Sequence, residues 1–336
     1  MAGTESLGIV VIGRNEGERL RICLRSVLSR GCPVVYVDST SADGSAALAR
    51  EMGSYVIELD PARTLSAARA RNEGFAQLLS RFPDLRQVQF VDGDCEIIDG
   101  WLERGAEALD ADGSVSGVCG RVWERNPDAN VYKRMVAIEW QKVPGEVAAC
   151  GGNFMVRAEA FRRVGGFRPE VIAAEDDELC FRLRQAGGRI LHLDAGMVWH
   201  EIAMTRLSQW LRRAQRAGHA YAQVAALHGR SRERLFVRDC LRAGFWGLAL
   251  PVVSLALAWP TRGLSLLLLA AYPLQIARVY PVGRRAGRSR TDALLFAVLS
   301  LAAKFPAVVG MLQYHWRRRR GSAMAIIEHK GSGRPA

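Results

Sequence analysis

Three apolar runs near the end of the chain restrict its fold more than any other feature of the sequence. Residues 243–260 and 263–277 contain no charged side chain, and Lys304 is the only charged residue between positions 293 and 316. A membrane-spanning helix needs about 20 apolar residues. A buried soluble helical domain does not account for so many leucines between clusters of arginine. The runs therefore predict membrane segments over about 243–260, 263–279 and 292–314.

Clusters of basic residues flank these runs and predict how they meet the membrane. Five arginines fall within residues 230–242 and five within residues 278–290. Because basic residues favour the cytoplasmic side, the first two segments are expected to form a hairpin with both ends in the cytoplasm. The third run ends in Arg317–Arg320, which a complete third span would place outside. Either this run bends at Lys304 and Pro306 as a re-entrant or interfacial segment, or it breaks the charge rule.

Charge also divides the chain into two parts. Residues 1–205 carry 24 basic and 30 acidic side chains, whereas residues 206–336 carry 22 basic and 4 acidic ones. The net charge of +12 thus comes from the second part, which argues against a nucleic-acid-binding protein. An apolar face that includes Trp210 and Tyr221 predicts an amphipathic helix over residues 206–228. This helix would lie on an anionic membrane surface or, alternatively, pack on the domain as an ordinary surface helix.

The cysteines and the first residues both indicate a cytoplasmic environment. The seven cysteines are scattered, odd in number and never arranged as C-x-x-C. They are expected to be small core residues in a reducing compartment rather than disulfides or zinc ligands. Residues 1–8 lack the basic and apolar stretches of a signal peptide. The chain up to residue 205 is therefore expected to stay in the cytoplasm.

The first 205 residues alternate between short apolar runs and segments of helical periodicity. Such alternation predicts an α/β fold with a mostly parallel, doubly wound sheet, whose ligands bind at the carboxyl ends of the strands. Two of the predicted strands end in aspartate, at Asp38 and Asp92. The predicted strands cover residues 8–12, 34–37, 55–59 and 88–91.

Asp92 begins a D-x-D pattern, Asp92-Gly-Asp94, directly after the fourth predicted strand. Two carboxylates one residue apart can both reach a hard divalent cation, which usually takes its remaining ligands from substrate phosphates and water. The alternative interpretation is a surface turn, because the pattern is short and common. Its companions in the sequence decide between the two.

Six segments of the chain resemble, in their order, the motifs of one known family. The pattern A-R-N-x-G occurs at Ala70–Gly74, and E-D-x-[DE]-L-x-x-R-L occurs at Glu175–Leu183. With the D-x-D pattern and the loops around them, they resemble family 2 glycosyltransferases of GT-A fold, over nearly all of the first 205 residues. The other segments that carry the resemblance are Gly8–Gly17, Val35–Ser45, Phe90–Asp94 with Trp101–Glu103, and Gly151–Asn153 with Val164–Phe167.

The resemblance implies that a nucleotide-diphosphate sugar and a divalent cation, Mg²⁺ or Mn²⁺, bind along the strand ends. The cation would neutralise charge that develops on the diphosphate as it leaves the sugar. The implied residues are Gly13 and Glu16 near the nucleoside, Asp38 as acceptor of a hydrogen bond from the base, Arg71 at the nucleotide or its phosphates, Asp92 at the ribose and the metal, Asp94 at the metal, and His200 as a third metal ligand.

The catalytic base is expected among the four consecutive acids Glu175–Glu178. Like charges raise the proton affinity of at least one of them, although an exposed acidic helix start is the alternative. The resemblance implies that Asp176 removes the proton of the acceptor hydroxyl, with Asp177 as the competing candidate, and a single base fits inversion. It further implies an acceptor side formed by Gly151, Gly152, Asn153 and Glu175.

These observations together predict a membrane-anchored, inverting glycosyltransferase at the cytoplasmic membrane, with its catalytic domain facing the cytoplasm. The acceptor is expected to be a membrane-associated, lipid-linked glycan. The alternatives are transfer to polyprenyl phosphate itself, or a non-catalytic membrane module that binds nucleotide sugars. Residues 215–219 depart from the Q-x-x-R-W of processive polysaccharide synthases, which argues against polymerisation. The expected parts are a catalytic domain (1–205), a basic interfacial helix and linker (206–242), membrane helices (243–316) and a basic flexible tail (317–336).

Overall fold

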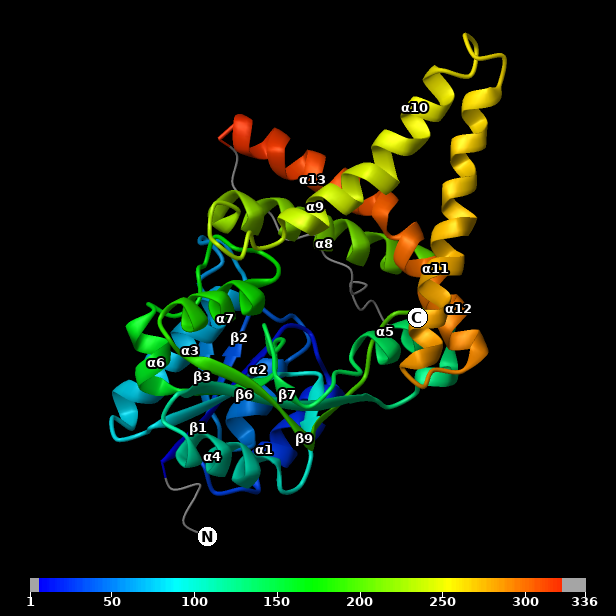
Figure 1. Ribbon diagram of the computed structural model, residues 1–336. Helices are drawn as coiled ribbons and strands as arrows, with labels where there is room; N and C mark the ends of the chain where they lie inside the picture. The colour runs from blue at the N-terminus through cyan, green and yellow to red at the C-terminus, as the bar shows by residue number, and fades with distance from the viewer. Residues whose placement is uncertain (1–5, 322–336) are drawn as a thin grey trace. The chain divides into compact units, whose positions relative to one another are not determined.

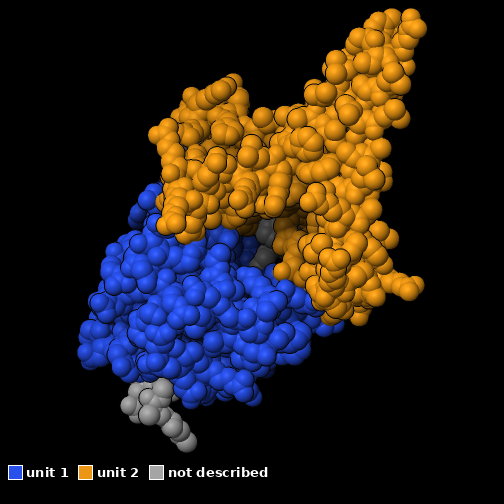
Figure 2. Space-filling view, in the orientation of Figure 1, with its two compact units in different colours: residues 1–126, 140–202, 333–336 blue, residues 127–139, 203–332 orange. Residues whose placement is uncertain are grey.

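The computed structural model describes residues 6–321, which form two compact units (Figure 2). Unit 1 contains the described residues up to 126 together with residues 140–202. Unit 2 contains residues 127–139 and the described residues from 203 onward. Most of the predicted basic tail, residues 322–336, lies outside the described part of the chain.

A mixed sheet forms the centre of unit 1 (Figure 1). Within residues 6–321 it has nine strands, of which eight follow the order β3-β2-β1-β4-β8-β6-β9-β5, while β7 pairs with β9. One half of the sheet is parallel. It consists of β1 (Leu7–Gly13), β2 (Val34–Asp38), β3 (Tyr55–Glu58) and β4 (Gln87–Asp92).

The other half of the sheet contains antiparallel pairs. Strand β8 is antiparallel to β4 and β6, whereas β6 and β9 run parallel to each other. Strands β5 and β7 are both antiparallel to β9. The bounds are Cys95–Ile97 for β5, Val115–Glu124 for β6, Gly145–Glu146 for β7, Phe154–Arg157 for β8 and Arg189–His200 for β9.

The α/β fold expected from the sequence is confirmed, and the four predicted strands are β1 to β4. Strands β1 and β2 are apolar runs buried on both faces, as parallel strands covered by helices require. The antiparallel pairing around β8 was not predicted. The helices of unit 1 are α1 (Glu18–Leu28), α2 (Ser45–Glu51), α3 (Ala67–Arg81), α4 (Trp101–Ala111), α6 (Ala158–Arg163) and α7 (Glu175–Gln185).

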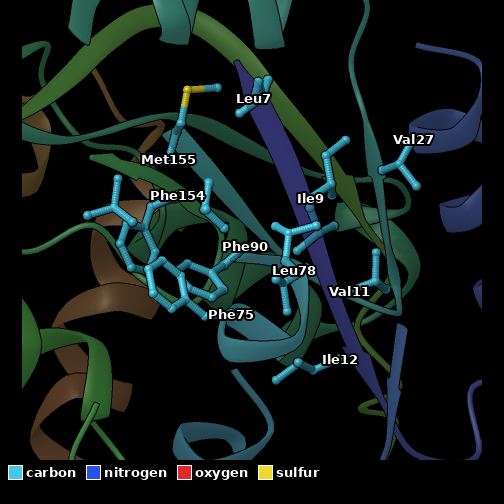
Figure 3. Packing of buried hydrophobic residues seen from close by; sticks show 14 of the residues in the cluster. Leu7, Ile9, Val11, Ile12, Val27, Phe75, Leu78, Phe90, Phe154 and Met155 are labelled. Carbon is cyan, nitrogen blue, oxygen red and sulfur yellow. The ribbon is translucent and has the colours of Figure 1, made fainter. Parts of the chain in front are cut away.

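The core of unit 1 fixes helix α3 against the sheet (Figure 3). Phe75 and Leu78 of α3 are buried beside Ile9 of β1 and Phe90 of β4, and each such side chain stabilises the fold by about 1.5–3 kcal/mol. A Cβ added at Gly74 would lie only 2.4 Å from Val10 Cγ1. The backbone of α3 therefore rests directly on β1, which sets the position of the residues one turn earlier.

Unit 2 is helical, and three of its stretches are long and apolar enough to cross a membrane. They cover Val237–Ala256, Leu264–Arg285 and Arg290–Arg319. The first begins earlier, and the second ends later, than the sequence predicted. The elements are α5 (Val131–Glu139), α8 (Leu207–His228), α9 (Val237–Gly244), the π-helical η2 (Phe245–Ala249), α10 (Leu250–Ala256), the 3₁₀-helical η3 (Leu264–Ala270), α11 (Ala271–Arg285), α12 (Arg290–Ala302) and α13 (Lys304–Arg319).

The first two stretches form a hairpin (Figure 1), and many of its apolar side chains are exposed. Near its turn Trp259 is 93% exposed, and Leu255 and Leu267 are exposed along its sides. The third stretch divides at Ala303 into α12 and α13, next to Lys304 and Pro306. This is the place where the sequence predicted a bend.

Two further helices of unit 2 make contacts between distant parts of the chain. Helix α5 lies within the predicted catalytic domain, yet it belongs to unit 2, where Arg134 Nε donates to Asp292 Oδ1 of α12 at 2.6 Å. Helix α8, the predicted amphipathic helix, packs on α13 so closely that a Cβ at Gly218 would lie 1.9 Å from the Ala307 carbonyl oxygen. Leu207, on the same helix, is exposed.

Candidate active site

Three strands bring the first site residues to one edge of the sheet. In the parallel register, Gly13 at the end of β1 lies opposite Asp38 at the end of β2. Ile12 lies opposite Asp92 at the end of β4. Asp38 and Asp92 therefore flank the end of β1 on its two sides, at the carboxyl edge where ligands bind in such sheets.

The loops after β1 and β2 are tied to each other. The Asn15 backbone N–H donates to Ser41 Oγ at 2.9 Å, and Asn15 Oδ1 accepts from the Ala42 N–H at 2.8 Å. Asn15 has a positive φ of 54°, which asparagine tolerates better than most residues. Glu16, beside it, is buried and forms an ion pair with Arg19 at 2.8 Å. The two loops thus form one fixed wall of the site.

Hydrogen bonds from β2 and from the loop that follows it hold the side chain of Asp38 in place. Its carboxylate accepts hydrogen bonds from the Tyr36 hydroxyl at 2.9 Å and from the Ser41 N–H at 2.7 Å. Burial and the charge of Asp38 raise the pKa of the Tyr36 hydroxyl, so that it acts as a donor. Asp38 itself is 1% exposed. Each carboxylate oxygen already has one donor, and a nucleobase would have to use a remaining lone pair.

Arg71 joins the D-x-D motif to the acidic helix. Its Nη2 donates to Asp92 Oδ1 and its Nη1 to Glu175 Oε1, both at 2.8 Å. Burial acts to lower the pKa of Arg71, but the charges of Asp92 and Glu175 outweigh it and raise that pKa. The predicted donor residues Arg71 and Asp92 and the predicted acceptor residue Glu175 therefore form one ion-pair network, in which Arg71 and Glu175 are buried and Asp92 is partly exposed.

The Gly151–Asn153 loop is fitted against this network. A Cβ at Gly152 would lie 2.7 Å from Arg71 Nη2 and 2.9 Å from Asp92 Oδ2, so a side chain there would have to displace these groups. Asn153 Oδ1 accepts from the Asp92 backbone N–H at 2.9 Å. These two residues, predicted on the acceptor side, thus contact the D-x-D motif itself.

A second group contains Asp94, Cys95 and His200, whose ligand atoms all lie within 4.8 Å of one another. His200 Nε2 lies 3.4 Å from Asp94 Oδ1, and His200 Nδ1 lies 3.8 Å from Glu124 Oε2. Strands β5 and β9 produce this group, because Cys95 is paired with His200 in their register. Asp92 is not a member, since its carboxylate points to Arg71.

The donor set of this group fits a divalent cation. A carboxylate oxygen and an imidazole nitrogen suit Mn²⁺, whereas Mg²⁺ prefers oxygen alone and a thiol suits softer metals. Among the described residues His200 Nδ1 has no hydrogen-bond partner, although it is buried. A carboxylate behind a metal-binding histidine orients its ring, and Glu124 stands in that place.

Asp176 and Asp177 lie in the first turn of α7 and differ in their electrostatics. Burial and the charge of Glu175 raise the pKa of Asp176 to about 6, against the opposing charge of Arg71. Burial and the charge of Asp176 raise the pKa of Asp177 to about 8. Both carboxyl groups therefore hold a proton more tightly than a free aspartate does, as a general base that works near neutral pH requires.

Some positioning residues were not singled out from the sequence. The Asn72 side chain accepts from the Phe167 N–H at 2.9 Å and donates to the Phe167 carbonyl at 2.8 Å. Arg182 forms an ion pair with the fully buried Glu178 at 2.7 Å and donates to the Gly166 carbonyl at 2.6 Å. Asn72 and Arg182 thus both hold the loop at Gly166 and Phe167, whose phenyl ring lies beside Arg71. Glu124 lies outside every motif of the resemblance and carried no sequence signal.

Comparison with protein-family models now places the chain in a class. A model described as "Glycosyl transferase family 2" matches residues 8–165, and one described as "Glycosyl transferase family group 2" matches residues 97–305. The second covers more than half of the chain. The protein therefore belongs to the family 2 glycosyltransferases, as the resemblance of its motifs indicated.

Two named relatives are similar in sequence. The chain is 28% identical over 236 residues to a pre-mycofactocin glycosyltransferase of Mycobacterium tuberculosis, which covers 66% of this chain and 47% of that protein. It is 27% identical over 194 residues to glycosyltransferase AglE of Haloferax volcanii, which covers 54% of this chain and 62% of that protein. The chain thus spans about half to three-fifths of the length of these relatives.

Solved structures confirm the GT-A fold. The mannosyltransferase PcManGT of Pyrobaculum calidifontis, in complex with GDP-Man and Mn²⁺, matches 91% of this chain and 87% of its own with a TM-score of 0.56 and 19% identity. TarS residues 1–349 of S. aureus, in complex with UDP, match 94% of this chain and 92% of theirs with a TM-score of 0.52 and 17% identity. At these identities the likeness concerns the fold.

Proposed function

We propose that this protein is a membrane-anchored, inverting glycosyltransferase that uses a nucleotide-diphosphate sugar. One observation carries the proposal: Arg71 links Asp92 of the D-x-D motif to Glu175, the residue before Asp176. The expected donor motif is thereby connected to the residue that precedes the expected base. The solved relatives of the same fold bind GDP-Man and UDP, which supports a nucleotide donor.

The chemistry follows from the charges at this network. Asp176, ionised above a pKa of about 6, accepts the proton of an acceptor hydroxyl as its oxygen attacks the anomeric carbon. The bond from that carbon to the diphosphate breaks on the opposite face, which inverts the configuration. A divalent ion held by Asp94 and His200 would neutralise the charge of the departing diphosphate. The Mn²⁺ complex of PcManGT supports such an ion.

The membrane part of the proposal rests on unit 2. The exposed leucines of the α10–α11 hairpin and the basic residues at its two ends fit a hairpin with both ends on the cytoplasmic side. An enzyme held there meets acceptors that are themselves in the membrane. We therefore propose a lipid-linked glycan as acceptor, with residues 1–205 as the catalytic part and residues 206–242 lying on the anionic surface, where each basic charge contributes about 1 kcal/mol.

A transfer assay on the full-length protein tests the proposal. A panel of nucleotide sugars is incubated with a membrane extract and Mn²⁺ or Mg²⁺, with a chelator as control, and the products are analysed by mass spectrometry. Asp176→Asn is expected to abolish transfer and to retain donor binding. Donor binding without turnover in the wild type would instead indicate a non-catalytic module. A product that contains a single sugar on polyprenyl phosphate would identify the alternative acceptor.

A further inference from the structure

An exposed pair of tryptophans lies on the sheet of unit 1, each directly before a residue at the candidate metal group, Glu124 or His200. Trp123 of β6 and Trp199 of β9 are paired in the register of the two strands. Their ring centroids are 6.3 Å apart with an interplanar angle of 37°. Trp123 is 41% exposed and Trp199 is 40% exposed. Large aromatic side chains contribute most when buried, so an exposed pair marks an interaction surface.

This pair lies on the face of strands β5, β6 and β9 that is opposite to the face of Cys95, Glu124 and His200. Side chains alternate along a strand, so neighbouring residues point to opposite faces. In the register, Trp123, Trp199 and Glu96 are matched with one another, and Glu124, His200 and Cys95 with one another. We call the first set, with its surroundings, the tryptophan face.

The rim of the tryptophan face consists of ion pairs. Arg121 binds Asp194 with two hydrogen bonds, at 2.6 and 2.9 Å. Arg125 forms an ion pair with Glu96, which follows Asp94 by two residues. Each arginine on the face is therefore matched by a carboxylate, and these four residues carry no net charge.

The floor beside the rings is kept flat by a glycine. A Cβ at Gly196 would lie 3.4 Å from the Trp123 indole nitrogen and 3.0 Å from Ile98 Cδ1. Any larger residue there would meet the Trp123 ring. The absence of a side chain at this position leaves this edge of the Trp123 ring uncovered.

The charge balance separates the classes of ligand that this face could bind. Anionic lipids and nucleic acids are bound by cationic groups that have no acidic partner. Arg121 and Arg125 each have one, so this face does not fit such a ligand. A neutral sugar presents apolar C–H faces, which stack on aromatic rings, and hydroxyl groups, which bind arginines and carboxylates alike. Two rings framed by paired donors and acceptors fit a neutral oligosaccharide.

We propose that the tryptophan face binds the glycan part of the acceptor, as an accessory site outside the catalytic centre. This inference rests on the proposed function, because it assumes an acceptor that carries several sugars. A glycan held on the same domain has a raised effective concentration at the transfer site. The face would therefore lower the KM of long acceptors without changing the chemistry on short ones.

The experiment compares Trp123→Ala, Trp199→Ala and the double variant with the wild type, all as full-length protein in detergent. Tyr55→Ala is the matched control, since Tyr55 is also 40% exposed but lies on β3. Binding to a panel of neutral oligosaccharides of two to six sugars is measured by glycan array and calorimetry. We expect the double variant to bind at least tenfold more weakly, the control to bind as the wild type does, and Trp→Phe variants to retain binding.

Two readouts separate this inference from the proposed function. Donor hydrolysis in each variant is expected to stay within twofold of the wild type, and KM for long acceptors to rise while that for short acceptors does not. Equal loss for both acceptor lengths, or unchanged glycan binding, would overturn the tryptophan face. Loss of binding to anionic vesicles, or of a dimer, in the tryptophan variants would overturn it as well. If neither the wild type nor any variant transferred sugar, while glycan binding still depended on the tryptophans, the proposed function would be overturned and the tryptophan face would stand.

Discussion

Arg71 Nη2 and Asp92 Oδ1 are 2.8 Å apart, in an ion pair that links helix α3 to the end of strand β4. The Arg71 side chain is 3% exposed, and its other terminal nitrogen is bound to Glu175. A guanidinium with two carboxylates and no solvent is a structural element as much as a ligand-binding group. Its removal leaves two acids without their counter-charge.

Arg71→Met is therefore expected to destabilise unit 1 by about 3 kcal/mol, because breaking a buried ion pair leaves uncompensated charge. Thermal unfolding followed by fluorescence measures the change. Arg21→Met is the control, since Arg21 and Glu18 form an exposed pair worth less than about 1 kcal/mol. Adding Glu175→Gln should restore part of the stability, and a melting temperature that is unchanged by Arg71→Met would refute the role of the network.

The ionisation of Asp176 predicts the pH dependence of transfer. Because its pKa is raised to about 6, the base is protonated and inactive below that pH and ionised above it. The kcat/KM for transfer should rise about tenfold per pH unit below 6 and level off above. Asp177→Asn should keep this rising limb, because Asp176, the proposed base, remains in place. A limb near pH 8 that disappears in Asp177→Asn would show instead that Asp177 is the base.

Metal binding should depend on Asp94 and His200 to different degrees. Asp94→Asn is expected to weaken Mn²⁺ binding at least tenfold, while His200→Ala should reduce the preference for Mn²⁺ over Mg²⁺, since it removes the nitrogen ligand. Glu124→Gln should have a similar but smaller effect through the His200 ring. Calorimetry with each ion measures these constants. Asp99→Asn, at an exposed position, serves as the control. An unchanged Mn²⁺ affinity in Asp94→Asn would show that Asp94 does not bind the ion.

Gly152 offers a steric test of the same site. Gly152→Ala places a methyl group 2.7 Å from Arg71 Nη2, so the ion pair with Asp92 has to shift. We expect kcat to fall at least tenfold while the protein remains folded. Gly113→Ala is the matched control, because a Cβ there meets nothing within 4 Å. Equal activity of the two variants would show that the loop is not held against Arg71 in solution.

The hairpin of unit 2 predicts how the protein partitions. The full-length protein should stay with membranes after alkaline extraction. Leu255→Lys with Leu267→Lys places two charges on exposed apolar helices, each costing about 2.5–3.5 kcal/mol at the centre of a span. This double variant should appear in the soluble fraction, whereas Leu255→Ile with Leu267→Ile should not. Wild-type protein in the soluble fraction would contradict both the anchor and the lipid-linked acceptor.

Local patterns were sufficient for the parallel half of the fold and for part of the site. The apolar runs that became β1 to β4 are each continuous in the sequence, and Asp38 and Asp92 follow directly from where two of them end. The membrane runs are local in the same way. The order of the family motifs along the chain added Arg71, Asp94 and the acidic helix to the predicted site.

Contacts between residues that are distant in the sequence could not be predicted from it. Glu124 meets His200 only because β6 and β9 are neighbours, and no periodicity records that register. Likewise, the carboxylate of Asp92 binds Arg71, and Gly152 and Asn153 lie against it from the loop before β8, which is distant in the sequence. Helix α5 is connected to α12 of unit 2 by the Arg134–Asp292 contact, between residues that are 158 positions apart in the sequence.

The contact between α8 and α13 has a consequence for engineering. Gly218 touches the backbone at Ala307, and Gly310 touches it at Gln215, so neither helix can take a side chain at these points. The packing surfaces of α8 and α13, which are far apart in the chain, are therefore complementary in shape. A chimaera that borrows its final helix from another protein would have to borrow α8 along with it.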